Sequence, residues 1–292
     1  MIRKNWMIWI GLTVLCFTKC EKNPQNSVYR KEVTVFGYLW GNQPLGLSNA
    51  ISIHYSQPLD REFSFESAAI QNARVTLTDS VTGESWALKD EQNPGKYFNE
   101  NLVIRASTTY LLQIETDDRI ITASTTVPPA PAFETDLKTD EVNVEFQKNL
   151  GYEKPVRVTC EHCLDSQMLL VDMFCDEPYE NARYINPFFG QDKPTSQEEY
   201  DGGINGEPRH IQAFVSYQDL VSPDFNHDYV IYWYASMIVF YGRYTMQIMT
   251  VDDNYLNFVF DEHPMLSGGI QGGIGLFASM CGQTFQLNIQ TN

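Results

Sequence analysis

Short runs of alternating apolar and polar residues fill the chain between residues 29 and 127. In the segment ARVTLTD, Val75 and Leu77 fall on one face while Thr76 and Thr78 fall on the other, which is the two-residue period of a half-buried strand. Sequences rich in Gly, Asn, Asp and Pro separate the runs, as expected of turns. The predicted strands are residues 33–39, 50–56, 73–79, 85–90, 109–116 and 120–127.

About seven short strands in roughly 100 residues are typical of an immunoglobulin-like β-sandwich. The segment VPPAPAF, residues 127–133, then interrupts the alternation, because proline cannot donate a hydrogen bond within a central strand. We therefore expect a domain boundary here. The predicted division of this all-β chain is residues 1–20 as a signal peptide, 21–132 as the sandwich and 133–292 as a second, less regular β domain with one helix.

Beyond the boundary the chain stays rich in β-branched and aromatic residues, which favour strands. The most aromatic run, residues 229–249, is predicted to form two strands with a break at Tyr241-Gly242-Arg243. Residues 176–209 contain a long polar stretch and predict a loop. The other predicted strands are residues 142–146, 156–160, 168–174, 210–217 and 284–290.

The segment VDDNYLNFVFDEH, residues 251–263, has a different period. Asp252 or Asp253 can cap the N-terminus of a helix. The helical period then gathers four apolar side chains on one face, namely Tyr255, Leu256, Val259 and Phe260. The segment therefore predicts the helix of the second domain.

The chain starts with MIRKNWMIWIGLTVLCFTKC, in which Arg3 and Lys4 precede an apolar run from Trp6 to Phe17. A bilayer core needs roughly 20 apolar residues, so this shorter run is typical of an export signal. Cys20 stands where cleavage would fall, and polar EKNPQNS follows it. The arrangement resembles a bacterial lipoprotein signal, in which Cys20 would carry the covalent lipid, such as palmitate. The alternatives are Cys16 as the anchor, an ordinary secretory signal and an N-terminal membrane helix.

The charge of the chain excludes some partners. There are 20 basic and 37 acidic residues, and the net charge is −17. Such a surface repels phosphate groups, so we expect no binding to nucleic acid. For the same reason we expect the membrane contact to run through the lipid anchor alone.

Several segments occur in an order that resembles one protein family. They are VTVFGYL (33–39), NARVTLTDSVTGESWAL (72–88), NPGKY (93–97), TTYLLQIETDDRIITASTTVPPAP (108–131) and YLNFVFDEHPMLSGGIQGGIGLFASM (255–280). Together they are similar to the Bacteroidota lipoproteins catalogued as DUF family 4249. The resemblance implies a surface or outer-membrane lipoprotein that is often encoded beside a TonB-dependent transporter.

Four cysteines follow the signal segment. Cys160 and Cys163, with His162 between them and Cys175 beyond, could hold zinc. However, the second cysteine pair of a zinc ribbon is missing, and export favours disulfides. We therefore predict one or two disulfides among Cys160, Cys163, Cys175 and Cys281 and expect no metal, with free buried thiols and a metal site as the alternatives.

No motif for catalysis stands out. The segment SGGIQGGIGLF, residues 267–277, lacks the Gly-Lys-Ser/Thr ending of a phosphate loop, and we expect its glycines to allow a tight turn and close packing. The chain has no G-x-S-x-G elbow, and its histidines occur singly. Acidic pairs such as Asp252-Asp253 are expected to form a solvated face rather than a glycosidase or calcium site. The sequence thus predicts no catalytic residue and no cofactor beyond the lipid on Cys20.

Aromatic residues are concentrated between Tyr229 and Tyr244. Alternate side chains of a strand face the core, which leaves about half of these rings to pack elsewhere. Tyrosine and tryptophan are favoured at protein interfaces and as stacking platforms for ligands. Core packing, a protein partner and a ligand platform are all open interpretations. The candidate partner or ligand residues are Phe188, Phe189, Tyr232, Tyr234 and Tyr241.

These observations predict a non-catalytic lipoprotein of the outer membrane, exposed at the cell surface. We expect it to act as an accessory subunit of an outer-membrane β-barrel protein, either a TonB-dependent transporter or an assembly or secretion barrel. The alternative is a stand-alone surface lipoprotein that binds a glycan or a peptide.

Overall fold

The computed structural model describes ten stretches of the chain. They are residues 29–58, 60, 62–90, 93–137, 142–145, 150–159, 168–185, 193–202, 209–216 and 228–290. Within them the fold is mostly β, which confirms the predicted all-β class. Among the residues described, no helix is both long enough and apolar enough to cross a membrane.

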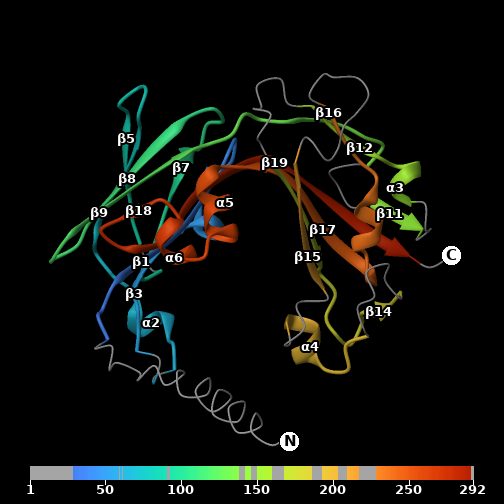
Figure 1. The fold of residues 1–292 in the computed structure, drawn as a ribbon, viewed down its shortest axis with the longest axis horizontal. Coiled ribbons are helices and arrows are strands. Elements are labelled where there is room, and N and C mark those ends of the chain that lie inside the picture. The colour runs from blue at the N-terminus through green and yellow to red at the C-terminus, as the bar shows by residue number, and fades with distance from the viewer. Residues whose placement is uncertain are drawn as a thin grey trace, which may run out of the picture.

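One large sheet runs through the whole molecule (Figure 1). In spatial order its strands are β15 (His210–Ser216), β13 (Met168–Cys175), β17 (Phe240–Val251), β19 (Ile274–Gln290), β1 (Val33–Trp40), β3 (Ile51–Tyr55) and β6 (Lys96–Tyr97). Two short strands join it at the side, β11 (Val142–Glu145) beside β19 and β14 (Arg183–Tyr184) beside β17.

Three smaller sheets complete the β structure. The largest has the order β18 (Ile270–Gln271), β9 (Ile120–Thr126), β8 (Thr109–Glu115), β4 (Arg74–Asp79) and β5 (Ser85–Leu88). The others are β10 (Ala132–Glu134), β12 (Val156–Thr159) and β16 (Asp228–Ile231), and the pair β2 (Pro44–Leu45) and β7 (Asn99–Val103). The alternating segments of the sequence therefore form strands where the pattern predicts them.

The helices are short. They are α2 (Phe65–Ala68), α3 (Leu150–Glu153), α4 (Gln197–Gly202), α5 (Asp253–Phe260) and α6 (Pro264–Ser267), with 3₁₀ turns η1 (Leu47–Asn49) and η3 (Trp233–Met237). Helix α5 confirms the helix predicted in residues 251–263. Helix α4 and strand β14 lie within residues 176–209, where a loop was predicted.

Two cores lie on the same face of β19, because the odd-numbered side chains of this strand serve both. Phe277 and Cys281 belong to a first core between β1, β3 and the sheet containing β4, β8 and β9. Phe285, Leu287 and Ile289 belong to a second core with β12, β13 and β17. We call the parts of the molecule around these cores the first lobe and the second lobe.

Strand β19 joins the two lobes covalently and by hydrogen bonds. Its first part pairs in parallel with β1, from Thr34 opposite Ile274 to Trp40 opposite Met280. Its later part pairs antiparallel with β17, from Met280 to Ile289. The first lobe therefore includes residues 270–281, which the sequence assigned to the second domain.

The glycine-rich segment before β19 allows this close approach, as expected. Gly275 has a φ of +122°, and a Cβ atom there would lie 2.0 Å from the carbonyl oxygen of Val35 on β1. Gly272 has a φ of +82° and turns the chain from β18 into β19. The segment is thus a site of backbone packing.

The aromatic run between residues 229 and 249 breaks in a different place from the one predicted. Strand β17 continues through Tyr241-Gly242-Arg243, while the turn η3 separates β16 from β17. The break lies at η3 because its side chains fill the second core: Tyr234 and Met237 are buried there.

Candidate functional site

The face of β19 that carries its even-numbered side chains changes from apolar to polar along the strand. Leu276, Ala278 and Met280 are buried beneath α5 in a third apolar cluster. Thr284, Gln286, Asn288 and Gln290 follow on the same face and are polar. This face therefore has an apolar end in the first lobe and a polar end in the second.

An aromatic band covers the apolar end. It consists of Phe36, Tyr38 and Trp40 from β1, Phe214 from β15, and Tyr255 and Phe258 from α5. Its rings pack edge to face or tilted: Tyr38 and Phe214 each lie 6.1 Å from Tyr255, measured between ring centroids. Rings at this distance attract one another and fix the position of α5.

Three apolar side chains on the neighbouring helices α5 and α6 are open to solvent, and we call them the α5–α6 patch. Val259 is 41% exposed, Phe260 63% and Leu266 69%. The Phe260 ring lies 5.1 Å from that of Phe214 at the margin of the band. The predicted helical face is thus only partly correct, because Tyr255 is buried while Val259 and Phe260 point outward.

Polar contacts hold the start of α5 to both sheets of the first lobe. The Asp252 carboxylate caps the helix by accepting a hydrogen bond from the Tyr255 N–H at 3.0 Å. The Thr125 hydroxyl on β9 contacts this carboxyl group and lies 2.6 Å from the Ser279 hydroxyl on β19. Burial raises the pKa of the Asp252 carboxyl group, against the hydrogen bonds it accepts.

Asn254 in α5 makes a second set of hydrogen bonds to the two sheets. The Asn254 side-chain amide donates to the Ser124 carbonyl at 2.7 Å and to the Phe277 carbonyl at 2.8 Å. Together with the Asp252 contacts, this bridges β9 and β19. The α5–α6 patch therefore stands on an anchored base.

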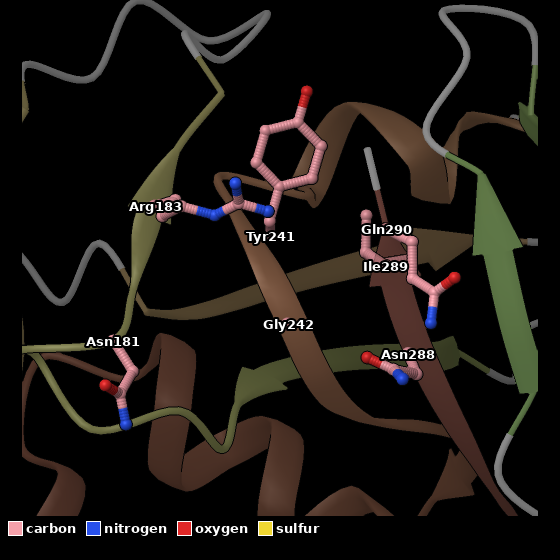
Figure 2. A pocket seen from close by; sticks show the side chains of 7 residues that line it. All are labelled: Asn181, Arg183, Tyr241, Gly242, Asn288, Ile289 and Gln290. Atoms are coloured by element: carbon pink, nitrogen blue, oxygen red, sulfur yellow. The ribbon is translucent and has the colours of Figure 1, made fainter. Parts of the chain in front are cut away.

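A polar pocket of about 350 Å³ lies at the other end of the same face, where β14, β17 and β19 meet (Figure 2). Its lining side chains include three amides, one guanidinium and one phenol: Asn181, Asn288, Gln290, Arg183 and Tyr241. Figure 2 shows the amides of β19 on one side of the hollow and Arg183 with Tyr241 on the other.

Strand pairing sets the geometry of this pocket. Arg183 on β14 lies opposite Tyr241 on β17, and the centre of its guanidinium group is 5.2 Å from the centroid of the tyrosine ring. A guanidinium over an aromatic face is attracted by the ring. Gly242 then pairs with Ile289, so the middle of the pocket carries no large side chain from β17.

Arg183 differs from the other arginines of the described residues. Each of the others has a carboxylate within 4 Å: Arg30, Arg74, Arg105, Arg119, Arg157, Arg209 and Arg243. Within the described part of the chain no carboxylate pairs with Arg183, which instead contacts the Tyr241 ring. The nearby acid Glu177 is held by Arg243, through its backbone N–H at 3.0 Å and its Nε at 3.3 Å. The pocket therefore keeps a net positive charge on an acidic chain.

The structure separates the predicted surface tyrosines. Tyr241 lines the pocket, and Tyr232 is 40% exposed outside it. Tyr234 is fully buried, so its prediction as a surface residue is wrong; η3 turns it into the second core, where its hydroxyl donates to the Lys154 carbonyl at 2.9 Å. The predicted residues Cys20, Phe188 and Phe189 lie outside the described residues.

Two of the four cysteines named for disulfides are described. Cys175 and Cys281 are buried free thiols in different cores, so they do not pair with each other. Burial raises the pKa of both thiols. Cys160 and Cys163 lie outside the described residues.

Sequence reasoning missed Arg183, Asn181, Asn288 and Gln290. Asn288 and Gln290 of β19 carried one usable signal, because polar and apolar residues alternate in TFQLNIQ, which places the polar side chains on one face. Nothing in the sequence around Arg183 indicated that β14 would pair with β17.

The fold and these surfaces define an all-β protein in which two lobes share one strand and one face carries an aromatic band and a polar pocket. Residues 42–279 match the family described as Domain of unknown function (DUF4249), and the chain belongs to that family. Among curated proteins, none matches the chain.

Several solved structures are similar to the chain at low sequence identity. The chain is similar to a segment of two fibronectin type III domains from chicken tenascin, with 11% identity, coverage of 75% of this chain and 89% of that one, and a TM-score of 0.17. It is also similar to the FN1–FN3 domains of chicken CNTN1, with 9% identity, coverage of 89% and 65%, and a TM-score of 0.18.

Proposed function

We propose that this protein is a non-catalytic, lipid-anchored accessory subunit of an outer-membrane β-barrel protein, working at the cell surface. The observation that carries the proposal is the α5–α6 patch, three exposed apolar side chains on an anchored base. Exposed apolar side chains that are grouped and rimmed by polar residues are typical of protein interfaces. Exposed acidic residues Asp261 and Glu262 lie between the two helices and supply such a rim.

The partner is inferred from the reach of the anchor. If Cys20 carries the lipid, residues 21–28 separate it from the first described residue, Tyr29. Eight residues span at most about 29 Å when fully extended. The folded part would therefore stay close to the membrane, where a membrane-embedded partner meets it at high effective concentration. The family resemblance supports a barrel of the TonB-dependent class or an assembly or secretion barrel.

The patch can be tested by purifying the protein with its partner. A tag after Asn292 allows isolation from native membranes in mild detergent, and mass spectrometry identifies what co-purifies. We expect a stoichiometric β-barrel protein with the native chain and its loss from the double variant Phe260→Ser, Leu266→Ser. Both side chains are mostly exposed, so the variant should fold, which its melting temperature checks.

Two controls make this experiment decisive. Val81→Ser removes an 83%-exposed side chain from the turn between β4 and β5, and this variant should keep the partner. The Cys20→Ser variant should be absent from the membrane fraction and should not incorporate a labelled fatty acid. Recovery of the native lipoprotein as a lone monomer would contradict the proposed function, as would loss of the partner from both the patch variant and the Val81→Ser control.

A stand-alone surface lipoprotein that binds a glycan or a peptide is the second candidate function. The polar pocket with Arg183 and Tyr241 is the observation that favours it. Met280, which is buried beneath α5, and Asn288, which lines the pocket, are about 27 Å apart along β19, so one molecule has room for both functions.

A further inference from the structure

We propose that the pocket between β14, β17 and β19 binds a sugar unit that carries a carboxylate. The inference specifies the ligand of the second candidate function and does not depend on a barrel partner. It rests on the guanidinium of Arg183, with which no carboxylate pairs in the described part of the chain, on the tyrosine ring beside it and on the amides that surround both.

The charge of the pocket selects the sign of the ligand. The chain carries a net charge of −17, and the other described arginines are neutralised by neighbouring carboxylates. Leaving one guanidinium unpaired in a hollow produces a local positive potential that attracts an anion. Guanidinium binds a carboxylate through two parallel hydrogen bonds, which adds geometric selectivity to the charge attraction.

The rest of the lining indicates a sugar. Side-chain amides both donate and accept hydrogen bonds, which suits neighbouring hydroxyl groups. The Asn181 side chain makes no hydrogen bond within the described structure, and Asn288 and Gln290 face it across the hollow (Figure 2). The flat ring of Tyr241 can pack against the apolar face of a pyranose. A peptide carboxylate would instead favour an apolar side-chain pocket, whereas the single aliphatic lining residue here, Ile289, is buried.

Gly242 makes room for an acidic side chain beside the pocket. This residue has a φ of +121°, and a Cβ atom there would lie 2.2 Å from the Glu177 Cγ atom. The Glu177 side chain is in turn fixed by Arg243. The glycine thus leaves room for the Glu177 side chain, whose negative charge is neutralised by Arg243.

The test is titration calorimetry on the purified protein lacking residues 1–20, with trigalacturonic acid as the probe. Maltotriose, acetate and trialanine serve as neutral-sugar, carboxylate and peptide comparisons. We expect trigalacturonic acid to bind at least roughly tenfold more tightly than each of them. Arg183→Gln should weaken this binding about ten- to hundredfold, the range for loss of a charge-assisted hydrogen-bond pair.

Matched variants separate the pocket from general charge effects. Arg74→Gln removes a similarly exposed arginine from β4 in the first lobe and should leave binding unchanged. Tyr241→Phe keeps the ring and should retain most of the affinity, whereas Tyr241→Ala should lose it. The proposal is overturned if trigalacturonic acid does not bind, if maltotriose, acetate or trialanine binds as well, or if Arg183→Gln and Arg74→Gln behave alike. None of these outcomes changes the test of the α5–α6 patch.

Discussion

Asp252 connects three elements, α5 and β9 through its buried carboxyl group and β19 through its backbone N–H. Its carboxylate caps α5 and contacts Thr125 on β9. Its backbone N–H donates to the Ser279 carbonyl on β19 at 3.0 Å. A buried carboxylate is costly unless hydrogen bonds compensate, and here burial outweighs them, so the pKa is raised from its ordinary value of 3.8. The residue therefore holds α5 in place at a cost that depends on pH.

Substitutions of Asp252 should separate the cap from the charge. Asp252→Ala loses the N-cap and the contact to Thr125, and we expect the free energy of unfolding to fall by about 1–2 kcal/mol at neutral pH. Asp252→Asn keeps a side chain that can accept from the Tyr255 N–H and donate to Thr125, and should cost less. Urea unfolding of both variants gives these values.

The pH dependence of the native protein relative to Asp252→Asn has a fixed sign. A raised pKa means that the folded state holds the proton more tightly than the unfolded state. The stabilisation is therefore fully present below pH 3.8 and is lost as the pH rises through the folded-state pKa. Urea titrations of both proteins between about pH 3 and pH 8 measure this difference. A native protein that gains stability over Asp252→Asn as the pH rises would contradict the assigned cause.

At the scale of the element, the side chains of β19 lie in four different surroundings along one strand. Its odd-numbered side chains serve two cores, and its even-numbered side chains pass from the aromatic band to the polar pocket. Its pairing with β1 requires close contact, because the backbone of Gly275 lies against that of Val35. A side chain at this position would push the two strands apart.

Gly275→Ala should therefore be strongly destabilising. The new Cβ atom would meet the Val35 carbonyl oxygen at 2.0 Å, and the φ of +122° is unfavourable for alanine. We expect the free energy of unfolding to fall by at least about 3 kcal/mol in a urea titration. Gly83→Ala is the matched control: its φ is +74°, but no atom lies within 4 Å of the new Cβ, so only the backbone penalty of about 1 kcal/mol applies. Equal losses in the two variants would contradict the close packing.

Strands with one buried face could be predicted from the sequence, whereas most of β19 could not. Val75 and Leu77 alternate with threonines because β4 packs on one side only, and that period is visible in the sequence. Residues 275–281 of β19 are buried on both faces, so no alternation appears, and the glycines before them resemble a loop. Only the last part, where polar residues return on one face, was predicted as a strand.

The candidate site was predictable to a similar extent. Tyr241 was named because exposed aromatic residues favour binding, which depends only on the residue type and its surroundings in the chain. Its partner Arg183 comes from β14, and its amide neighbours come from β19. Long-range pairing brings these residues together, and no local pattern encodes it. Tyr234 was wrongly named because η3 interrupts the strand that the alternation assumed.

At the scale of the whole molecule, the two lobes share β19 and should unfold together. Removal of a shared strand would expose both cores, so the loss of one lobe deprives the other of its pairing partner. Figure 1 shows this strand running from the first lobe to the second. We therefore expect one cooperative transition in place of the two independent transitions that separate domains would give.

Tryptophan fluorescence can report on each lobe separately. Trp40 and Trp86 lie in β1 and β5 of the first lobe, and Trp233 lies in η3 of the second. In protein lacking residues 1–20, Trp233→Phe leaves reporters in the first lobe, while the double variant Trp40→Phe, Trp86→Phe leaves one in the second. In each variant, the urea midpoint measured by fluorescence should equal the midpoint measured by circular dichroism. Two separate midpoints within one variant would show that the lobes are independent.

The parallel pairing of β1 with β19 also fixes an order of events in time. A chain that emerges N-terminus first, from the ribosome or through an export channel, presents β1 long before its partner, with every other strand made in between. Contacts so distant in sequence form late and slowly. One edge of β1 therefore waits without its native partner during emergence, and such an edge invites wrong pairing unless it is shielded. The same delay keeps the early part of the chain unfolded enough to pass through a narrow export pore. Pairing of β19 with β1 then completes the fold after export.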